Sequence, residues 1–369
     1  MSSSALDVSA VPRAAAEPRA ATPFIVGPWF DGAFFFASVL TVFAAWIASA
    51  SFGVSGFYVL AAVAIASNGP HLASTWTRVY MDRREWKKRP VQIFLVPLAI
   101  LGAIVGLTFW GARGFALENT VLLYWATWHF LQQNWGLLRI YQRRSGEPDS
   151  ALALRLERPL LYLSVAWCAL HRLKTGPRTL FGTEVAYPDL PWPVIHALLG
   201  VVVCLALVYL VLRVREARAS AWIRVGFLLC AFLGFAVPFL LIKTDGTTAF
   251  AAAACWHGLQ YIGIVRFYHR NAWTKGVAPY ARVVSWLSQP GWGRVFLYSC
   301  LLWALAGSGY VLIYGGSLLT RGTSWTIETW GGVTWLSLTF SHYYLDGVIW
   351  KLRRDKQVAQ SLLLDAPPT

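Results

Sequence analysis

The chain has 369 residues, of which 57% are hydrophobic and only 13% charged, and its formal net charge is +15. Soluble domains carry about 25% charged residues, so this composition excludes an ordinary water-soluble domain. Apolar runs recur along the whole chain, each long enough to cross a hydrocarbon core of roughly 30 Å. We therefore predict an all-α, polytopic transmembrane helical bundle, because the alternating polar-in pattern of a membrane β-barrel is missing.

Composition divides the chain into three regions. Residues 1–28 are rich in Ala, Ser and Pro and lack an apolar stretch followed by a small-residue cleavage site, so we interpret them as a flexible tail rather than a signal peptide. Residues 29–354 form a single transmembrane helical domain, and residues 355–369 form a C-terminal tail. No predicted loop is long enough to fold alone, so function must lie in the bundle or its short loops.

Ten apolar spans are predicted within the helical domain. The fifth is the weakest, because it is short and ends in His171, Arg172 and Lys174; it is either a full span or a re-entrant or interfacial element. The ten approximate ranges are 32–52, 54–80, 91–112, 117–141, 159–175, 193–213, 222–242, 247–268, 294–315 and 326–350.

The basic residues lie in short segments between the apolar runs. With the N-terminus inside, 21 Lys and Arg residues fall on the cytoplasmic side and six on the opposite side. Cytoplasmic loops carry an excess of Lys and Arg, so we predict a multi-pass protein of the cytoplasmic (inner) membrane with both termini in the cytoplasm. No basic stripe is interleaved with exposed aromatic residues, so the predicted partner is the lipid bilayer and not nucleic acid. The six exceptions are Arg113, Arg172, Lys174, Arg178, Lys243 and Arg321.

Four of the seven histidines lie deep inside the second, fourth, eighth and tenth spans, which all run in the same direction. The next basic residue follows each of them after 7, 10, 9 and 9 residues. At 1.5 Å per residue, the four imidazoles lie roughly 10–15 Å from the cytoplasmic interface. Four histidines at one depth, one on each helix, predict convergence on a single point. These residues are His71, His129, His257 and His342.

Histidines in hydrocarbon must hydrogen-bond, line a polar cavity or bind a ligand, because an unpaired polar group there costs several kcal/mol. Neutral imidazole suits iron, copper or zinc, and its second nitrogen usually donates to an amide, carboxylate or carbonyl group. Such groups occur three or four positions from the four histidines, at Asn68, Gln132, Gln260 and Asp346. For Asp346 the alternative is an interfacial pair with Lys351 or Arg353.

Aromatic residues adjoin the histidines and are predicted to line an apolar substrate cavity, with plain helix packing as the alternative for each. They are Trp128, Trp256, Tyr261 and Tyr343.

Four short segments resemble the Brp/Blh family of membrane beta-carotene dioxygenases. They are Pro70-His71, His129-Phe130, Cys255-Trp256-His257, and His342 with Asp346, in the same order along the chain. The resemblance implies a helical membrane protein that holds iron with histidines only. Tyr261 stands where the family has a second histidine in its third motif, so His342 would complete the ligand set.

Three functions follow from these patterns. The first is a membrane-embedded oxidoreductase in which His71, His129, His257 and His342 hold a metal ion, non-haem iron, that activates dioxygen beside a lipid-soluble small molecule such as an isoprenoid. The second is a haem-binding electron-transfer protein with two of the histidines as axial ligands. The third is a non-catalytic transporter or assembly factor whose histidines and Asp346 form a polar core. The sequence identifies no redox partner.

Overall fold

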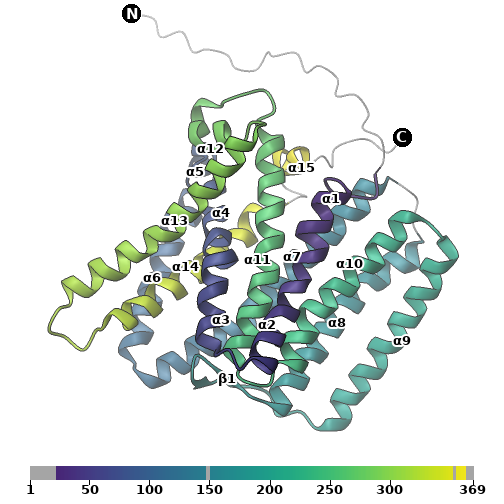
Figure 1. The fold of residues 1–369 in the computed structure, drawn as a ribbon, viewed down its shortest axis with the longest axis horizontal. Coiled ribbons are helices and arrows are strands. Elements are labelled where there is room, and N and C mark those ends of the chain that lie inside the picture. The colour runs from purple at the N-terminus through teal and green to yellow at the C-terminus, as the bar shows by residue number, and fades with distance from the viewer. Residues whose placement is uncertain (1–21, 147–149, 352–354, 363–369) are drawn as a thin grey trace, which may run out of the picture.

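The computed structural model describes residues 22–146, 150–351 and 355–362. Within this part of the chain the protein is almost entirely helical, in agreement with the all-α prediction (Figure 1). The predicted N-terminal tail lies outside the described residues up to position 21. Its last residues are ordered: Ile25 is buried, and its backbone N–H donates to a carboxylate oxygen of Asp31 at 2.7 Å.

Long helical segments occur at the positions of all ten predicted spans. Several consist of consecutive α-, 3₁₀- and π-helical pieces (η) that follow one another without a break. In chain order they are α1 (Pro28–Asp31), η1 (Gly32–Phe36), η2 (Ala37–Val39) and α2 (Leu40–Ser51); α3 (Gly56–Val63), η3 (Ala64–Asn68) and α4 (Gly69–Val79); η4 (Val91–Leu95) and α6 (Val96–Phe109); α7 (Ala112–Ser145); α8 (Ala151–Thr175); α9 (Trp192–Glu216); α10 (Ala219–Ala236) and η5 (Val237–Leu241); α11 (Gly246–Ala272); α13 (Trp292–Leu319); and α14 (Ile327–Ile349).

Shorter elements connect these segments. A two-residue turn joins β1 to β2, and both of its residues, Phe181 and Gly182, have positive φ, as a tight hairpin turn requires. The shorter elements are α5 (Arg83–Lys88), β1 (Thr179–Leu180), β2 (Thr183–Glu184), η6 (Pro279–Ala281), α12 (Arg282–Leu287) and α15 (Lys356–Ser361). Helix α15 lies in the predicted C-terminal tail, and its residues Val358 and Ala359 are buried. That part of the tail is therefore packed against the bundle.

Five segments are long and apolar enough to cross a membrane by length and composition: Pro28–Ser51, Val91–Phe109, Trp192–Glu216, Ala219–Leu241 and Trp292–Leu319. The chain is therefore a helical membrane protein, while the count of ten spans and the side of the termini stay predictions. The remaining long helices are more polar. They include α4, α7, α11 and α14, which carry the four histidines.

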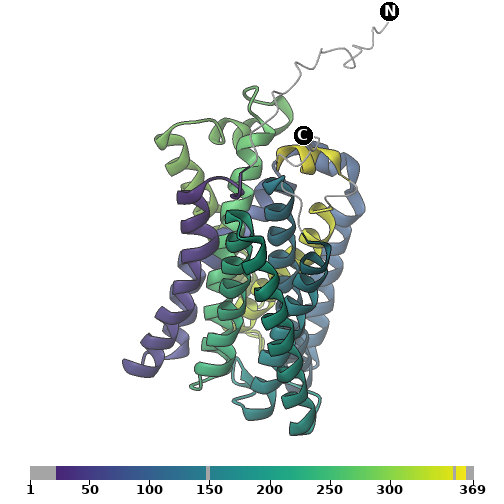
Figure 2. The ribbon, with the colours of Figure 1, turned by 90° about the vertical axis from the view of Figure 1, so that its right-hand side faces the viewer.

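Helix α11 lies at the centre of the molecule and contacts α2, α3, α4, α7, α10 and α15. Small buried side chains such as Ala251 and Ala252 allow its neighbours to approach closely. To one side of it lie α4, α6, α13 and α14, and to the other lie α8, α9 and α10 (Figure 1). Turned by 90°, most of the long helices run side by side (Figure 2). The histidine-bearing helices thus meet in the interior.

Helix α8 begins at Ala151, earlier than the predicted start of the fifth span at 159. The predicted span left Glu157 outside the helix, and a carboxylate inside a span is costly. In the structure Glu157 is buried but accepts hydrogen bonds from Arg213 at 2.6 Å and from Tyr209 at 3.0 Å, and it lies 3.2 Å from Arg224. These partners offset the cost of burying the charge, so the helix continues through it.

Candidate metal centre

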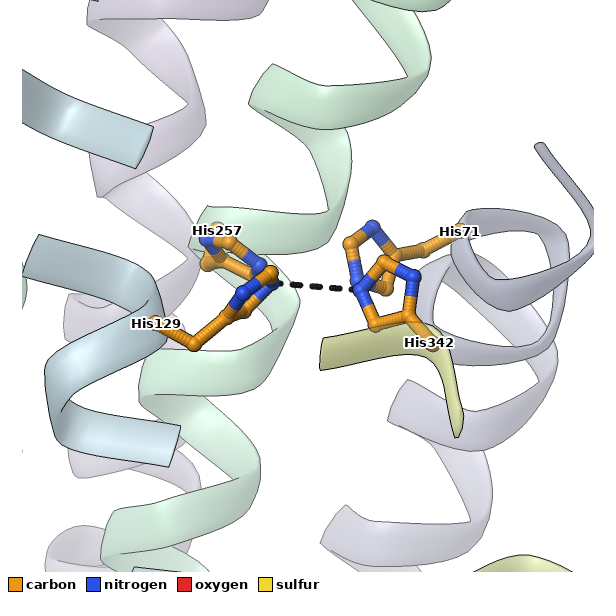
Figure 3. Close-up of side chains that lie close together, drawn as sticks. All are labelled: His71, His129, His257 and His342. Carbon is orange, nitrogen blue, oxygen red and sulfur yellow. Dashed lines mark hydrogen bonds between the residues drawn. The ribbon is translucent and has the colours of Figure 1, made fainter. Parts of the chain in front are cut away.

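The four predicted histidines converge from four helices on one point (Figure 3). Each offers one ring nitrogen to a group in which all four atoms lie within 4.8 Å of one another. The Nε2 atoms of His129 and His342 are 3.2 Å apart. We call this group of His71, His129, His257 and His342 the four-histidine centre.

A wide turn precedes the first of these histidines. The π-helical turn η3 leads into Gly69 and Pro70, and α4 then places His71 in its first turn. Proline has no N–H to donate to the preceding turn, and π-helical turns are a common way to accommodate such a break. A Cβ on Gly69 would lie 2.9 Å from the carbonyl oxygen of Ala64 and 3.0 Å from Cβ of Ala306. Glycine at this position therefore allows α4 to pack against α13.

The third histidine is brought close to the first by a glycine that follows it. A Cβ on Gly258 would lie 3.3 Å from Cβ of His71 and 3.5 Å from Cβ of Ser67. Without that atom, α11 and α4 approach until the ring centroids of His71 and His257 are 4.8 Å apart. The contact between α4 and α11 thus sets the spacing of two of the four rings.

All four histidines are buried, with exposed fractions of 0–7%. Among the described residues, Nδ1 of His71 and both ring nitrogens of His257 have no hydrogen-bond partner. Leaving a buried polar group unpaired costs about 1–3 kcal/mol. Each histidine gives one nitrogen to an ion, so an ion would engage at most two of these three atoms, one on His71 and one on His257. Such unpaired nitrogens are costly in a plain polar core but expected of ligands that bind an ion.

The spacing of the ligand atoms is close to that of a metal site. Metal–nitrogen bonds of about 2.0–2.2 Å allow two ligands on opposite sides of one ion to lie at most about 4.4 Å apart. The atoms of the four-histidine centre lie within 4.8 Å. Side-chain shifts of a few tenths of an ångström would therefore let the four histidines hold a single metal ion.

Two of the predicted imidazole partners bond to other groups, and a third does not bond to a ring. Gln132 donates to the hydroxyl of Tyr162 at 2.6 Å, and Oε1 of Gln260 accepts from Gln133 at 3.2 Å. Asn68 is half-buried and ends the η3 turn. Among the described residues, no hydrogen bond links any of these three to a histidine ring. Gln133 was not predicted; it also donates to the backbone carbonyl of His257 at 3.1 Å.

The fourth predicted partner, Asp346, lies beside the centre but reaches His342 through another residue. Its Oδ1 is 3.7 Å from Nδ1 of His342, whereas Oγ1 of Thr75 is 2.7 Å from that nitrogen and 3.0 Å from Oδ1 of Asp346. The hydroxyl of Tyr261 also donates to Oδ1, at 2.6 Å. Asp346 is 7% exposed. Among the described residues, no ion pair joins Asp346 to the alternative partner Lys351, and Arg353 lies outside them.

Thr75 was not identified from the sequence. The one available signal was its position four residues after His71, which places it on the same face of α4.

A cavity of about 520 Å³ adjoins the centre, lined by α7, α11, α14 and Leu362. His129 and Asp346 border it, together with the predicted lining residues Trp128, Tyr261 and Tyr343. Trp256 was predicted to line it and does not: its fully buried ring packs edge-on against Phe235 at 5.5 Å, between α10 and α11. Hydrophobic pattern alone did not indicate which face of α11 this side chain occupies.

The C-terminal helix α15 packs beside this cavity. Asp355 caps α15 by accepting from the backbone N–H groups of Gln357 and Val358, and it pairs with Arg89 at 3.1 Å and Lys88 at 3.6 Å. Burial raises the pKa of the Asp355 carboxyl, but the two cations outweigh it, so that the pKa lies below its usual value. These contacts hold Leu362 against the cavity.

No protein-family model, no curated protein and no solved structure matches this chain.

Proposed function

We propose that the protein is a membrane-embedded, non-haem iron oxidoreductase that acts on a lipid-soluble substrate such as an isoprenoid. His71, His129, His257 and His342 are the proposed ligands. The observation that carries the proposal is the burial of four imidazoles around one point, with three ring nitrogens that have no hydrogen-bond partner among the described residues.

The donor set favours a divalent transition metal. Four neutral imidazoles suit iron, copper or zinc rather than magnesium or calcium, which prefer oxygen ligands. Iron is the proposed ion because the motif order resembles a family that holds iron with histidines. A ferrous ion bound here would supply dioxygen activation. The protein supplies the ligand field, the exclusion of water by burial, and a lipid-binding space next to one ligand.

The cavity supports a lipid-soluble substrate. Its volume of about 520 Å³ falls within the usual range of roughly 300–1,000 Å³ for small-molecule sites. Trp125 and Tyr343 provide flat apolar walls, and Trp128 is half exposed on α7. A lipid chain held there would lie beside His129, with Tyr261 and Asp346 at the inner end of the cavity as hydrogen-bonding groups. The proposed setting is the cytoplasmic membrane, with both termini inside.

Ring packing in the centre favours a bare ion over haem. The ring centroid of His71 lies 4.3 Å from that of His342 and 4.8 Å from that of His257. Only His129 of the four borders the cavity. A porphyrin between two of these rings would have to displace the others. The unpartnered nitrogens likewise favour an ion over a hydrogen-bonded polar core in a transporter or assembly factor.

Metal analysis of the full-length protein purified in detergent tests the proposal. We expect about one iron per chain and no Soret band, and loss of the iron in His129→Ala and His257→Ala. His196→Ala is the matched control, because His196 is exposed and lies outside the centre. Wild-type protein without metal after anaerobic loading with Fe(II), or full loading of both centre variants, would contradict the proposal. A Soret band would favour haem instead.

Oxygen uptake tests the reaction itself. The iron-loaded protein is mixed with a long-chain polyprenyl lipid in detergent, and dissolved oxygen is followed with an electrode. We expect uptake that depends on the lipid and is lost in His257→Ala. Uptake that is equal without the lipid would contradict the proposed substrate class.

A further inference from the structure

We propose that Thr75 is a positioning residue that fixes the orientation and tautomer of His342 by linking its Nδ1 atom to Asp346. The inference rests on the proposed metal centre and adds to it a residue that neither the sequence motifs nor the four ligands identify. Thr75 lies on α4, whereas His342 and Asp346 lie one turn apart on α14.

Three short polar contacts surround the Thr75 hydroxyl, and all of them are enclosed. Its Oγ1 lies 2.7 Å from Nδ1 of His342, 3.0 Å from Oδ1 of Asp346 and 2.8 Å from the hydroxyl of Tyr261. Thr75 and His342 are both 0% exposed. Tyr261 in turn accepts from Nε1 of Trp350 at 3.2 Å. The contacts of α4 with α14 therefore join His342 to a network outside the centre.

Counting protons assigns a direction to this network. A threonine hydroxyl has one proton to donate, and a carboxylate can only accept. Tyr261 donates to Asp346, and Thr75 donates to the same oxygen. With its proton used in this way, Oγ1 of Thr75 can only accept from His342, so Nδ1 of His342 carries the ring proton. With both hydroxyl protons on Asp346, the contact of 2.8 Å between Thr75 and Tyr261 holds no proton. The reverse arrangement would leave the contact between Thr75 and Asp346 without a proton as well, so two oxygen pairs would face each other instead of one.

This direction leaves the other nitrogen of His342 free to bind an ion. Nε2 keeps its lone pair and points into the centre, 3.2 Å from Nε2 of His129. A hydrogen bond that ends on a carboxylate also raises the basicity of a ligating imidazole. Of the four histidines, His342 has an Nδ1 atom that is hydrogen-bonded to a side chain of the described residues, the hydroxyl of Thr75. The network thus prepares one ligand before the ion arrives.

Thr75→Val tests the inference, because it keeps the shape of the side chain and removes the hydroxyl. The probe is Co(II), whose visible absorption reports ligand geometry, and affinity is measured by competition with a chelator on the full-length protein in detergent. We expect binding about 10- to 100-fold weaker than in wild type, as for other outer partners of metal ligands, and an altered Co(II) spectrum. Thr75→Ser restores the hydroxyl and should recover both. Thr77→Val is the matched control, since Thr77 is equally buried on α4 and donates to the carbonyl of Ser74.

Each other outcome has a defined meaning. Wild-type affinity and spectrum in Thr75→Val, with Co(II) bound by the wild type, would overturn this inference and leave the metal centre standing. An equal loss in Thr75→Ser or in Thr77→Val would also overturn it, because the effect would then come from packing. If Thr75→Val does not fold, Asp346→Asn replaces it, with the same expected loss and with wild-type binding as the refuting result. A wild-type protein that binds no Co(II) and no iron overturns the proposed function as well.

Discussion

Gly258 allows α11 to approach α4, and enlarging it should disturb the metal centre without replacing a ligand. In Gly258→Ala the new methyl group would lie 3.3 Å from Cβ of His71 and 3.5 Å from both Cβ and the carbonyl oxygen of Ser67. Carbon atoms pack best at about 3.5–4.0 Å. The His71 atom belongs to the stem of the side chain, which cannot rotate away. One helix must therefore move by a few tenths of an ångström.

The expected loss of metal affinity follows from the spacing of the ligand atoms, which leaves little tolerance for movement of the helices. Its ligand atoms lie within 4.8 Å, and one ion accepts opposite ligands at no more than about 4.4 Å, so a shift of α4 away from α11 acts against closure. Overpacking of this kind costs typically 1–3 kcal/mol. If this cost destabilises only the metal-bound protein, metal affinity falls roughly 5- to 150-fold.

Chelator competition with Fe(II) under anaerobic conditions measures this change, and thermal unfolding without metal is followed in parallel. Gly309→Ala is the matched control: Gly309 is also a buried helix glycine, but an added Cβ there would be 3.7 Å from its nearest neighbour, Cδ1 of Leu338. We expect the control to bind iron as the wild type does. Wild-type affinity in Gly258→Ala would refute the argument that the contact between α4 and α11 sets the spacing of the rings.

Two further predictions concern the cavity and the helix beside it. Gly347 lines the cavity, and an added Cβ there would meet no atom within 4 Å; Gly347→Leu should therefore leave iron content unchanged and weaken binding of the fluorescent polyene parinaric acid about tenfold or more. The docking of α15 should depend on pH. Because the pKa of Asp355 is lower in the folded protein than in the unfolded chain, its contribution is complete above an unfolded value of about 3.9 and is lost as the pH falls through the folded value. Hydrogen exchange of residues 356–361, corrected for its intrinsic pH dependence, should lose protection in that acid range.

Each of these two predictions has a control and a refuting result. Gly331→Leu lies on the same helix, away from the cavity and in equally open space, and parinaric acid binding equally reduced there would show that the cavity is not the binding site. Asp355→Asn should reduce protection of α15 already at neutral pH. A variant that keeps wild-type protection would show that the pair with Arg89 and Lys88 does not hold the helix.

Sequence patterns predicted the parts of the site that repeat along the chain. Each histidine lies in an apolar run and at a similar distance from a basic residue, so both the helices and the common depth of the rings were visible without tertiary information. Thr75 was not visible in this way, because its partner His342 is 267 positions away and an isolated threonine in a helix has no distinctive pattern. Trp256 was assigned to the cavity because it adjoins His257 in the sequence, but neighbouring residues in a helix point about 100° apart, and its ring packs against Phe235 instead. Glu157 lies just outside the predicted fifth span, and the partners that allow it inside a helix, Arg213 and Arg224, come from other helices and were not visible in the local sequence.

The wide turn η3 sets the rotation of α4 relative to α3 and thereby the direction of His71. A π-helical turn contains one residue more than an α-helical turn, and one residue in an α-helix corresponds to a rotation of about 100°. If all the residues of Ala64–Asn68 instead closed into a regular α-helix, the extra residue would rotate α3 and α4 relative to each other by about 100°. With α3 held by its packing against α11, His71 would turn out of the centre, although no ligand had been replaced. The phase between α3 and α4 therefore determines where the first imidazole points.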